Sequence, residues 1–337
     1  MKICALNTDR EVLLIAEIGN NHEGDARAAA ALAERALDCG AHIVKFQLIE
    51  PERLVSVEQI ERVKQLSRFK LPISVYQDIA RRVHERGGIF MASAFDVDTL
   101  AAILPTLDAV KIASGDLDFD PLLALAARSG KPVVLSTGMA TLPEIEHAVA
   151  AFRAALPPGA RLEDRLALLH CVSLYPTKPE QANLHGIETL RQRFGLVTGY
   201  SDHVLGIDVA VMSLGAGARI IEKHFTLDKN ASSFRDHALA ADPGELARLA
   251  VLVRGAKSII GGGAKDDSIA DRTSAHAVRR SVVAARALTE GTLLSAADLD
   301  FVRPAQGLPP ARASELIGRR LRRALRRHEL IRPEDVA

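Results

Sequence analysis

Two short polar triplets in this sequence contain residue types that bind metals and transfer protons. The first is SDH, residues 201–203, and the second is EKH, residues 222–224. Each closes a short apolar run, GLVTGY before the first and ARII before the second. Neutral imidazoles bind divalent transition metals, and two of them leave most of an octahedral shell open for water and substrate. His203 and His224 are therefore predicted to be the metal ligands of a catalytic site, if the fold brings them together.

The runs that precede the two triplets belong to a rhythm that repeats eight times. A short apolar run, often β-branched, is followed by a longer segment with helical periodicity. The eight runs cover residues 13–19, 42–47, 88–95, 109–115, 132–138, 166–173, 196–203 and 218–225. Apolar strands that alternate with amphipathic helices predict a parallel sheet covered by helices, and eight such units predict a (β/α)8 TIM barrel. The alternative is an open doubly wound sheet, but residues 17–25, EIGNNHEGD, lack its G-x-G-x-x-G turn.

Two of the helical segments carry clear end signals. The segment after Asp25 has this residue as its predicted N-cap and ends at Gly40, a residue typical of helix C-termini. In the segment TLPEIEHAVAAF, Thr141 and Glu144 have the spacing of a capping box. Both signals support helices between the predicted strands.

Polar residues at the ends of the predicted strands are the candidate site. In a TIM barrel the active site lies at the carboxyl ends of the strands, so these side chains should converge on one pocket. Lys45 and Gln47 are two residues apart and should share a strand face. Lys45, Lys111 and Lys223 are either paired structural cations or, with hydroxyl groups, the cradle of a phosphorylated or carboxylated substrate. The polar residues collected in this way are Glu17, Asn20, Asn21, His22, Lys45, Gln47, Ser93, Lys111, Ser114, Asp116, Ser136, Thr137, Ser173, Tyr175, Ser201, Asp202, His203, Glu222, Lys223 and His224.

Composition excludes several other classes of protein. The 337 residues include 43 basic and 42 acidic ones, so no general nucleic-acid or membrane surface is expected. No apolar run is long enough for a membrane span, and the first ten residues do not resemble a signal peptide. Cys4, Cys39 and Cys171 show no metal-ligand spacing and are interpreted as core thiols. A cytoplasmic location is expected.

The quoted motifs together resemble a known family. IAEIGNNHEGD, VKFQ, KIASGD, VVLSTGM, LLHCVSLYPT, GYSDH and IEKHFTLDK are similar to the sialic acid synthase family, whose members condense phosphoenolpyruvate with an N-acylated hexosamine to nonulosonic acids. The C-terminal part resembles the small β-rich antifreeze-like (SAF) domain of these synthases. The resemblance implies a catalytic barrel over residues 1–256, a linker over 257–276 and a SAF domain over 277–337.

The resemblance also implies roles for individual residues. His203 and His224 match the two metal ligands; Mn2+ is the family's usual ion, with Mg2+ or Co2+ possible. Glu17, Lys45 and Lys111 match catalytic positions, and Arg303 matches an arginine that reaches the acceptor's N-acyl group from the SAF domain of a domain-swapped homodimer. The remaining positions that match substrate contacts are Gln47, Ser93, Ser114, Asp116, Ser136, Ser173, Tyr175, Ser201 and Asp236.

Some positions depart from the family pattern and leave the acceptor sugar open. Ser173 replaces an asparagine of some members, and Asp116 replaces a glutamate. The segment after HFTLDKN is one residue longer than usual, and Asp236 is expected to take the place of its acidic residue. The acceptor is therefore expected to be N-acetylmannosamine or a related diacetamido sugar.

Two other functions are considered. A Schiff-base sugar aldolase would use Lys111 or Lys223 as its nucleophile. A non-enzymatic carbohydrate-binding or anion-binding module is the second alternative. The arginine-rich segment GRRLRRALRR, residues 318–327, has the leucine spacing of an amphipathic segment with a solvated basic face, so binding to nucleic acid is not expected.

Overall fold

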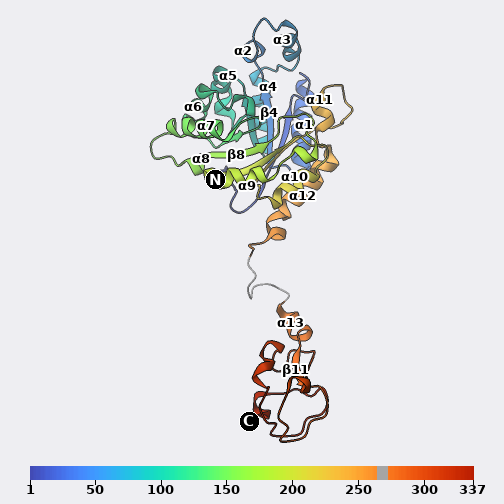
Figure 1. Cartoon of the computed structure of the whole chain (residues 1–337). Coiled ribbons are helices and arrows are strands. Elements are labelled where there is room, and N and C mark those ends of the chain that lie inside the picture. Colours follow the sequence, from blue (N-terminus) through green and yellow to red (C-terminus); the bar gives the residue numbers. More distant parts are fainter. Residues whose placement is uncertain (264–271) are drawn as a thin grey trace. The chain divides into compact units, whose positions relative to one another are not determined.

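The structure is a computed structural model that describes residues 1–263 and 272–337 (Figure 1). The chain divides into two compact units, Met1–Ile260 and Gly261–Ala337. The linker expected over 257–276 begins within helix α12 (Pro243–Ile260), and its residues 264–271 lie outside the described residues. No helix in the described part of the chain is long and apolar enough to cross a membrane.

The first unit contains a closed barrel of eight parallel strands, in the order β10-β3-β4-β5-β6-β7-β8-β9. This confirms the predicted (β/α)8 barrel, because each of the eight apolar runs coincides with one strand, and only β4 extends beyond its run, by one residue. The strands are β3 (Leu13–Gly19), β4 (Ile43–Leu48), β5 (Ile89–Ala94), β6 (Ala109–Ile112), β7 (Val133–Ser136), β8 (Leu166–Cys171), β9 (Val197–Asp202) and β10 (Ile220–His224).

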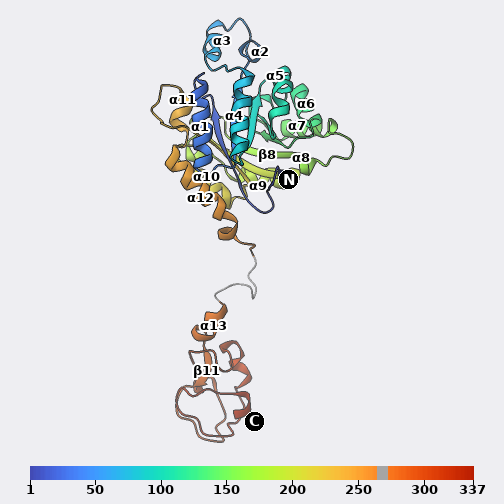
Figure 2. The same cartoon turned by 180° about the vertical axis from the view of Figure 1, so that it is seen from behind.

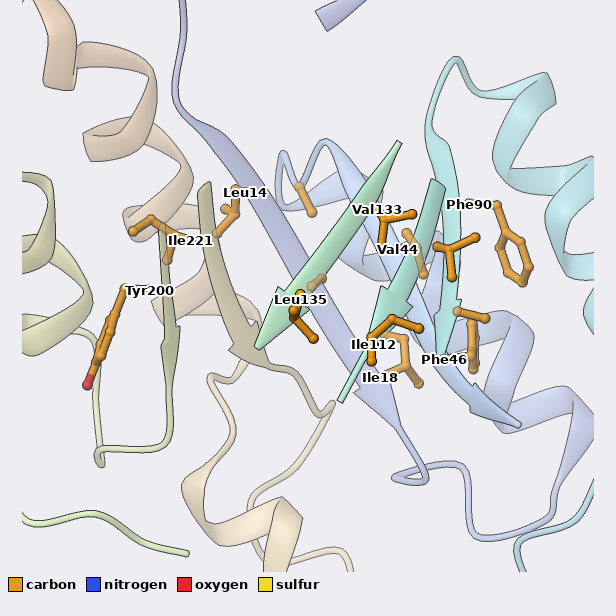
Figure 3. Packing of buried hydrophobic residues seen from close by; sticks show 14 of the residues in the cluster. Leu14, Ile18, Val44, Phe46, Phe90, Ile112, Val133, Leu135, Tyr200 and Ile221 are labelled. Atoms are coloured by element: carbon orange, nitrogen blue, oxygen red, sulfur yellow. The ribbon is translucent and has the colours of Figure 1, made fainter. Parts of the chain in front are cut away.

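Alternation along the strands separates two cores. Residues of one parity, such as Leu13 and Ile15, form the barrel interior, which contains only strand residues and the N-terminus. Residues of the other parity pack against the helices, as Figure 3 shows for Leu14, Val44 and Ile221. The inner face is apolar in the first half of β3 and becomes polar at Glu17. The strand ends can therefore carry polar groups without disrupting the packed interior.

Helices surround the barrel (Figures 1 and 2). Asp25 caps the first helix as predicted, because its carboxylate accepts hydrogen bonds from the backbone N–H groups of Arg27 and Ala28. The Glu144 carboxylate accepts the backbone N–H of Thr141 at 2.6 Å, which confirms that capping pair. The helices other than α12 in this unit are α1 (Ala26–Asp38), α2 (Pro51–Leu54), α3 (Ile60–Ser67), α4 (Ile73–Glu85), α5 (Val97–Ile103), α6 (Asp120–Arg128), α7 (Leu142–Ala154), α8 (Leu162–Arg165), α9 (His185–Phe194), α10 (Asp208–Gly215) and α11 (Arg235–Leu239).

A small hairpin precedes the barrel and was not predicted. Its strands are β1 (Lys2–Ile3) and β2 (Leu6–Asn7), and Ile3 is fully buried in the interior core. Cys4 lies in the turn of this hairpin with a φ of 51° and is exposed, so its interpretation as a core thiol is wrong. Cys39 and Cys171 are buried free thiols, as expected.

The second unit has its own small core. After α13 (Arg272–Val278), strands β11 (Ser281–Ala284) and β12 (Leu299–Val302) form an antiparallel pair. Isolated bridges extend this pairing, so the unit is rich in extended structure, as expected for this module. In the arginine-rich segment, Leu321 and Leu325 are buried in the core while the arginines around them are exposed, which agrees with the amphipathic interpretation.

Candidate active site

Most of the predicted site residues line one cavity of about 340 Å3 at the carboxyl ends of the strands. Each of the eight barrel strands contributes at least one side chain to it, and hydroxyl, carboxylate, ammonium and imidazole groups meet in it. The side chains that line it are Glu17, Lys45, Gln47, Ser93, Lys111, Ser114, Ser136, Met139, Cys171, Ser173, Tyr175, Ser201, His203, Glu222, His224 and Arg235. The predicted convergence of the strand ends is therefore present in the structure.

Two carboxylates share one ammonium group on the floor of this cavity. Lys45 Nζ lies 2.6 Å from Glu17 Oε2 and 3.7 Å from Glu222 Oε2, and all three side chains are buried. Burial raises the pKa of Glu17 and Glu222 adds to this, against the opposing effect of Lys45. Lys45 and Lys111 lower the pKa of Glu222 despite its burial. Glu17 is thus the carboxylate that takes up a proton more readily.

Gln47 holds Glu17 in place. Its Nε2 donates to Glu17 Oε1 at 2.7 Å, and its Oε1 accepts a hydrogen bond from Asn20 Nδ2 at 3.1 Å. Lys45 and Gln47 therefore share the inner face of β4, as their spacing predicts. One oxygen of Glu17 faces an amide and the other faces an ammonium, which fixes the carboxylate plane.

A second cationic group lies on the neighbouring side of the cavity. Lys111 Nζ donates to Ser136 Oγ and to the carbonyl of Ile112, both at 2.7 Å. Burial lowers the pKa of Lys111, although Glu222 opposes this effect. Ser93 Oγ is buried without a hydrogen-bond partner, so its hydroxyl is free to donate to a ligand. Two ammonium groups and the unpaired hydroxyl of Ser93 form a site suited to an anion.

The backbone at Gly138 lies close to side chains that line the same wall of the cavity. Gly138 donates its N–H to Ser114 Oγ at 3.0 Å, and Ser114 Oγ lies 3.1 Å from Cys171 Sγ. A Cβ at Gly138 would lie 2.4 Å from Ser173 Oγ and 2.7 Å from Cys171 Sγ. A side chain at this position would therefore displace the groups that line the cavity.

The two histidines are neighbours across β9 and β10, with ring centroids 5.6 Å apart. Burial lowers the pKa of each to about 4, so both rings are neutral at pH 7. His203 Nδ1–H donates to the Val172 carbonyl at 2.9 Å, which leaves the lone pair of Nε2 for a ligand. His224 Nδ1 is buried without a partner. The donor set fits a divalent ion bound by two imidazoles.

No cluster of three or more His, Cys, Asp or Glu side chains in residues 1–263 and 272–337 is arranged to hold a metal. An ion bound by His203 and His224 would therefore take its other ligands from water and substrate. Tyr175 closes this side of the cavity, with its ring 4.2 Å from that of His203. The guanidinium of Arg235 lies 4.6 Å from the Tyr175 ring centroid.

Several residues expected in the cavity point elsewhere. Lys223 is fully buried on the outer face of β10, where Nζ donates to Asp202 Oδ2 at 2.8 Å. The predictions that Lys223 belongs to an anion cradle, or acts as an aldolase nucleophile in this pocket, are therefore wrong. Lys223 lies one residue out of phase with Glu222 and His224, so its side chain is on the other face of the strand. Thr137 is also out of phase, and its hydroxyl donates to the Leu169 carbonyl.

Two of the predicted residues that follow β3 also have structural contacts. His22 packs against Phe46 and Tyr76, with centroid separations of 6.1 and 6.5 Å. Asn21 Nδ2 donates to the Phe225 carbonyl at 2.9 Å. Both therefore join the first strand's end to its surroundings rather than line the catalytic cavity.

Three predicted substrate contacts lie outside the catalytic cavity. Asp116 is half-buried in the 3-10 turn Ser114–Asp116, and burial raises its pKa to about 6. Asp236 lines an adjoining cavity rather than this one. Arg303 is an exposed residue of the second unit, directly after β12.

Three side chains that line the cavity, those of Cys171, Met139 and Arg235, were not among the predicted site residues. Glu222 was predicted as one of the polar residues at the strand ends, and its shared parity with His224 agrees with its place in the cavity. Cys171 is likewise in phase along β8 with Leu169 of the interior core. Met139 and Arg235 lie in loops or short helices after the strands, where no strand periodicity predicts the direction of a side chain.

Comparison with known proteins identifies relatives along almost the whole chain. The NeuB family model matches residues 32–265, and the SAF domain model matches residues 279–337. The N,N'-diacetyllegionaminic acid synthase of Campylobacter jejuni is 33% identical over 337 residues, which cover 96% of this chain and 99% of that protein. The human N-acetylneuraminate-9-phosphate synthase is 31% identical, over 91% of this chain and 88% of that protein.

A solved structure supports the same assignment. The N-acetylneuraminic acid synthetase of Leptospira borgpetersenii, in complex with citrate, is 34% identical and superposes with a TM-score of 0.73. The similarity covers 78% of this chain and 90% of that one. The barrel, the C-terminal module and the relatives agree: the chain belongs to the NeuB family of nonulosonic acid synthases and is a carbon–carbon bond-forming enzyme with a C-terminal SAF domain.

Proposed function

We propose that the chain condenses phosphoenolpyruvate with an N-acylated hexosamine, giving a nonulosonic acid and phosphate. The observation that carries this proposal is one cavity that holds two buried lysines, the unpaired hydroxyl of Ser93, a Glu17–Lys45 pair and two neutral histidines. The family assignment supports the same reaction. The acceptor is N-acetylmannosamine or a related diacetamido sugar.

Phosphoenolpyruvate would bind through its phosphate and carboxylate. Lys45 and Lys111 provide the positive charge, and Ser136 is already hydrogen-bonded to Lys111. The hydroxyl groups of Ser93 and Ser114 line the same cavity and can donate to anionic oxygens, whereas the hydroxyl of Ser201 donates to Glu222 Oε1 at 2.9 Å.

His203 and His224 would hold the divalent ion, for which we propose Mn2+, with Mg2+ or Co2+ as alternatives. When bound, such an ion polarises a carbonyl oxygen as a Lewis acid. The histidines contribute by remaining neutral at pH 7, since burial holds the pKa of each to about 4. The Val172 carbonyl orients His203 through its Nδ1–H.

The reaction forms one carbon–carbon bond and breaks one carbon–oxygen bond. The enol carbon C3 attacks the aldehyde carbon of the open-chain sugar, and the aldehyde oxygen takes up a proton. Water then adds to C2, and the C2–O bond to phosphate breaks to leave the keto group. Glu17 is positioned to exchange a proton in this sequence, because burial raises its pKa and Lys45 and Gln47 fix its direction.

Acceptor contacts would come from the rim and from a second subunit. Tyr175 and Ser173 lie on the rim of the catalytic cavity, and Asp236 lines the adjoining one. We propose that the protein forms a domain-swapped homodimer in which Arg303 reaches the acceptor bound by the other barrel, and Asp116 supports that rim. The cytoplasmic location expected from the composition stays a prediction.

The test is an acceptor screen with phosphoenolpyruvate and Mn2+. We expect phosphate release that depends on an N-acylated hexosamine, with a product mass equal to sugar plus pyruvic acid. Mixtures without acceptor serve as the control for simple hydrolysis. Phosphate release that is independent of every acceptor would contradict the proposal.

A further inference from the structure

A second cavity of about 590 Å3 adjoins the catalytic one. It lies between the segment of α2 and α3 and the loop that leads into α11. Gln47 and Arg235 line both cavities, so the two are neighbours across these side chains. Figure 1 shows α2 and α3 projecting from the barrel at the end where α11 also lies. A substrate bound in the first cavity can therefore extend into the second.

One side of this second cavity is apolar. Ile49, Leu66 and Phe69 are buried in a separate small cluster, against which Phe95 and Phe234 pack. The rings of Phe69 and Phe234 have centroids 4.8 Å apart. Phe69 comes from the segment of α2 and α3, and Phe234 comes from the loop before α11, so the contact between these two rings joins the two walls of the cavity. An aromatic and aliphatic wall favours an apolar group on the ligand.

A polar group lies where the two cavities meet. Asn20 is 5% exposed, and its Nδ2 donates to Gln47 Oε1 at 3.1 Å. Its Oδ1 is buried without a hydrogen-bond partner, and Asn20 is one of the residues that line the second cavity. A buried amide oxygen without a partner is unfavourable, so a ligand that donates an N–H or O–H to it gains affinity.

We propose that this cavity receives the arm of the acceptor sugar remote from its aldehyde and selects a second acylamido group there; the inference rests on the proposed synthase reaction. An acylamido group offers one N–H, which Asn20 Oδ1 accepts, and one methyl group, which packs on Leu66, Phe69 and Phe234. A hydroxyl group in the same place leaves the aromatic wall without a partner.

A phosphate on that arm is the competing occupant. It would bring two negative charges against the apolar wall and the amide oxygen of Asn20. Arg62, Arg68 and Arg235 also line the cavity, but all three are exposed, and Arg62 donates to Gln65 Oε1 at 2.6 Å. Exposed arginines are hydrated and compensate poorly for burying a dianion on the apolar side. The acylamido group is thus favoured.

The experiment compares kcat/KM for N-acetylmannosamine, its 6-phosphate and a 2,4-diacetamido trideoxyhexose, with phosphoenolpyruvate and Mn2+. The unchanged enzyme should prefer the diacetamido sugar by about 10-fold or more in kcat/KM, because one well-placed apolar group on a substrate changes kcat/KM by about this factor. Phe69→Ala should lower kcat/KM for the diacetamido sugar by about 10-fold, with little change for N-acetylmannosamine or in KM for phosphoenolpyruvate. Phe69→Leu should keep most of the preference.

The matched control is Val57→Ala, because Val57 is 68% exposed on the same segment and does not line the cavity. Preference for the phosphorylated sugar, equal use of all three acceptors, or equal losses for both acceptors in Phe69→Ala would overturn the inference. If no acceptor supports phosphate release, the proposed reaction fails. Calorimetric titration of the diacetamido sugar then tests the cavity separately, since binding weakened by Phe69→Ala supports it and absent binding overturns it.

Discussion

Glu17 and Lys45 are direct neighbours in the parallel strands β3 and β4, and Glu17 Oε2 lies 2.6 Å from Lys45 Nζ. Glu222 Oε2 lies 3.7 Å from the same ammonium group. The registers of β3 with β4 and of β10 with β3 thus bring three charged groups from three strands together. Of the two carboxylates, Glu17 takes up a proton more readily, because burial raises its pKa whereas Lys45 and Lys111 lower the pKa of Glu222.

Glu17→Gln should lower kcat by about 100-fold or more, with a much smaller effect on KM for phosphoenolpyruvate, because proton exchange is lost while both lysines remain. Steady-state phosphate release at saturating acceptor measures both constants. A loss confined to KM would assign Glu17 to substrate binding alone. Glu11→Gln, at a half-buried position outside the cavity, is the matched control.

Lys111→Met should raise KM for phosphoenolpyruvate by about 10-fold or more, because a charge-assisted hydrogen bond contributes about 1.5–3 kcal/mol. KM for the sugar should change little. Equal changes for both substrates would indicate a structural role. Borohydride with a carbonyl substrate should leave the unchanged enzyme active, whereas irreversible inactivation that requires Lys111 would support the Schiff-base aldolase.

Removal of the metal should abolish turnover reversibly. Chelation followed by addition of Mn2+ should restore activity in the unchanged enzyme. His203→Ala and His224→Ala should each lower kcat/KM by at least about 100-fold, because either change removes one of two protein ligands. Circular dichroism checks that the fold is intact. Full turnover by the double variant in metal-free buffer would exclude the metal site.

Lys223→Met should destabilise the protein by about 3–5 kcal/mol, because it leaves the Asp202 carboxylate buried without its cation. The double change Lys223→Met with Asp202→Leu should recover part of that loss. Urea unfolding measures the free energy. Arg81→Ala, which removes exposed pairs with Asp78 and Glu85, should cost at most about 1 kcal/mol. Unchanged stability in Lys223→Met would contradict the structural role of this pair.

Subunit exchange tests the proposed dimer. Glu17→Gln and Arg303→Ala proteins, each weakly active, should regain part of the activity when mixed under conditions that allow exchange. The reason is that one composite site of the mixed dimer would carry neither change. Two differently tagged copies of the unchanged enzyme establish that exchange occurs. No recovery despite exchange, or a fully active monomer, would refute the swapped arrangement.

Periodicity in the sequence was sufficient to predict the barrel and much of the site. Eight apolar runs with intervening helical segments specify the strands, and local capping groups such as Asp25 mark helix ends. The same period of two assigns Glu222 and His224 to one face of β10 and Lys223 to the other. Parity is a local property of an extended chain, so it can be read without knowledge of the fold.

Tertiary structure alone decided which side chains meet across elements. Asp202 pairs with Lys223 because β9 and β10 are adjacent in register, and neither residue by itself indicates its partner. Phe69 and Phe234 meet only because barrel closure places β10 beside β3, whose other neighbour is β4, and this brings the loops after β4 and β10 to one rim. Loop directions have no periodicity to reveal them, so the sequence determined the strand ends and the folded barrel determined the second cavity.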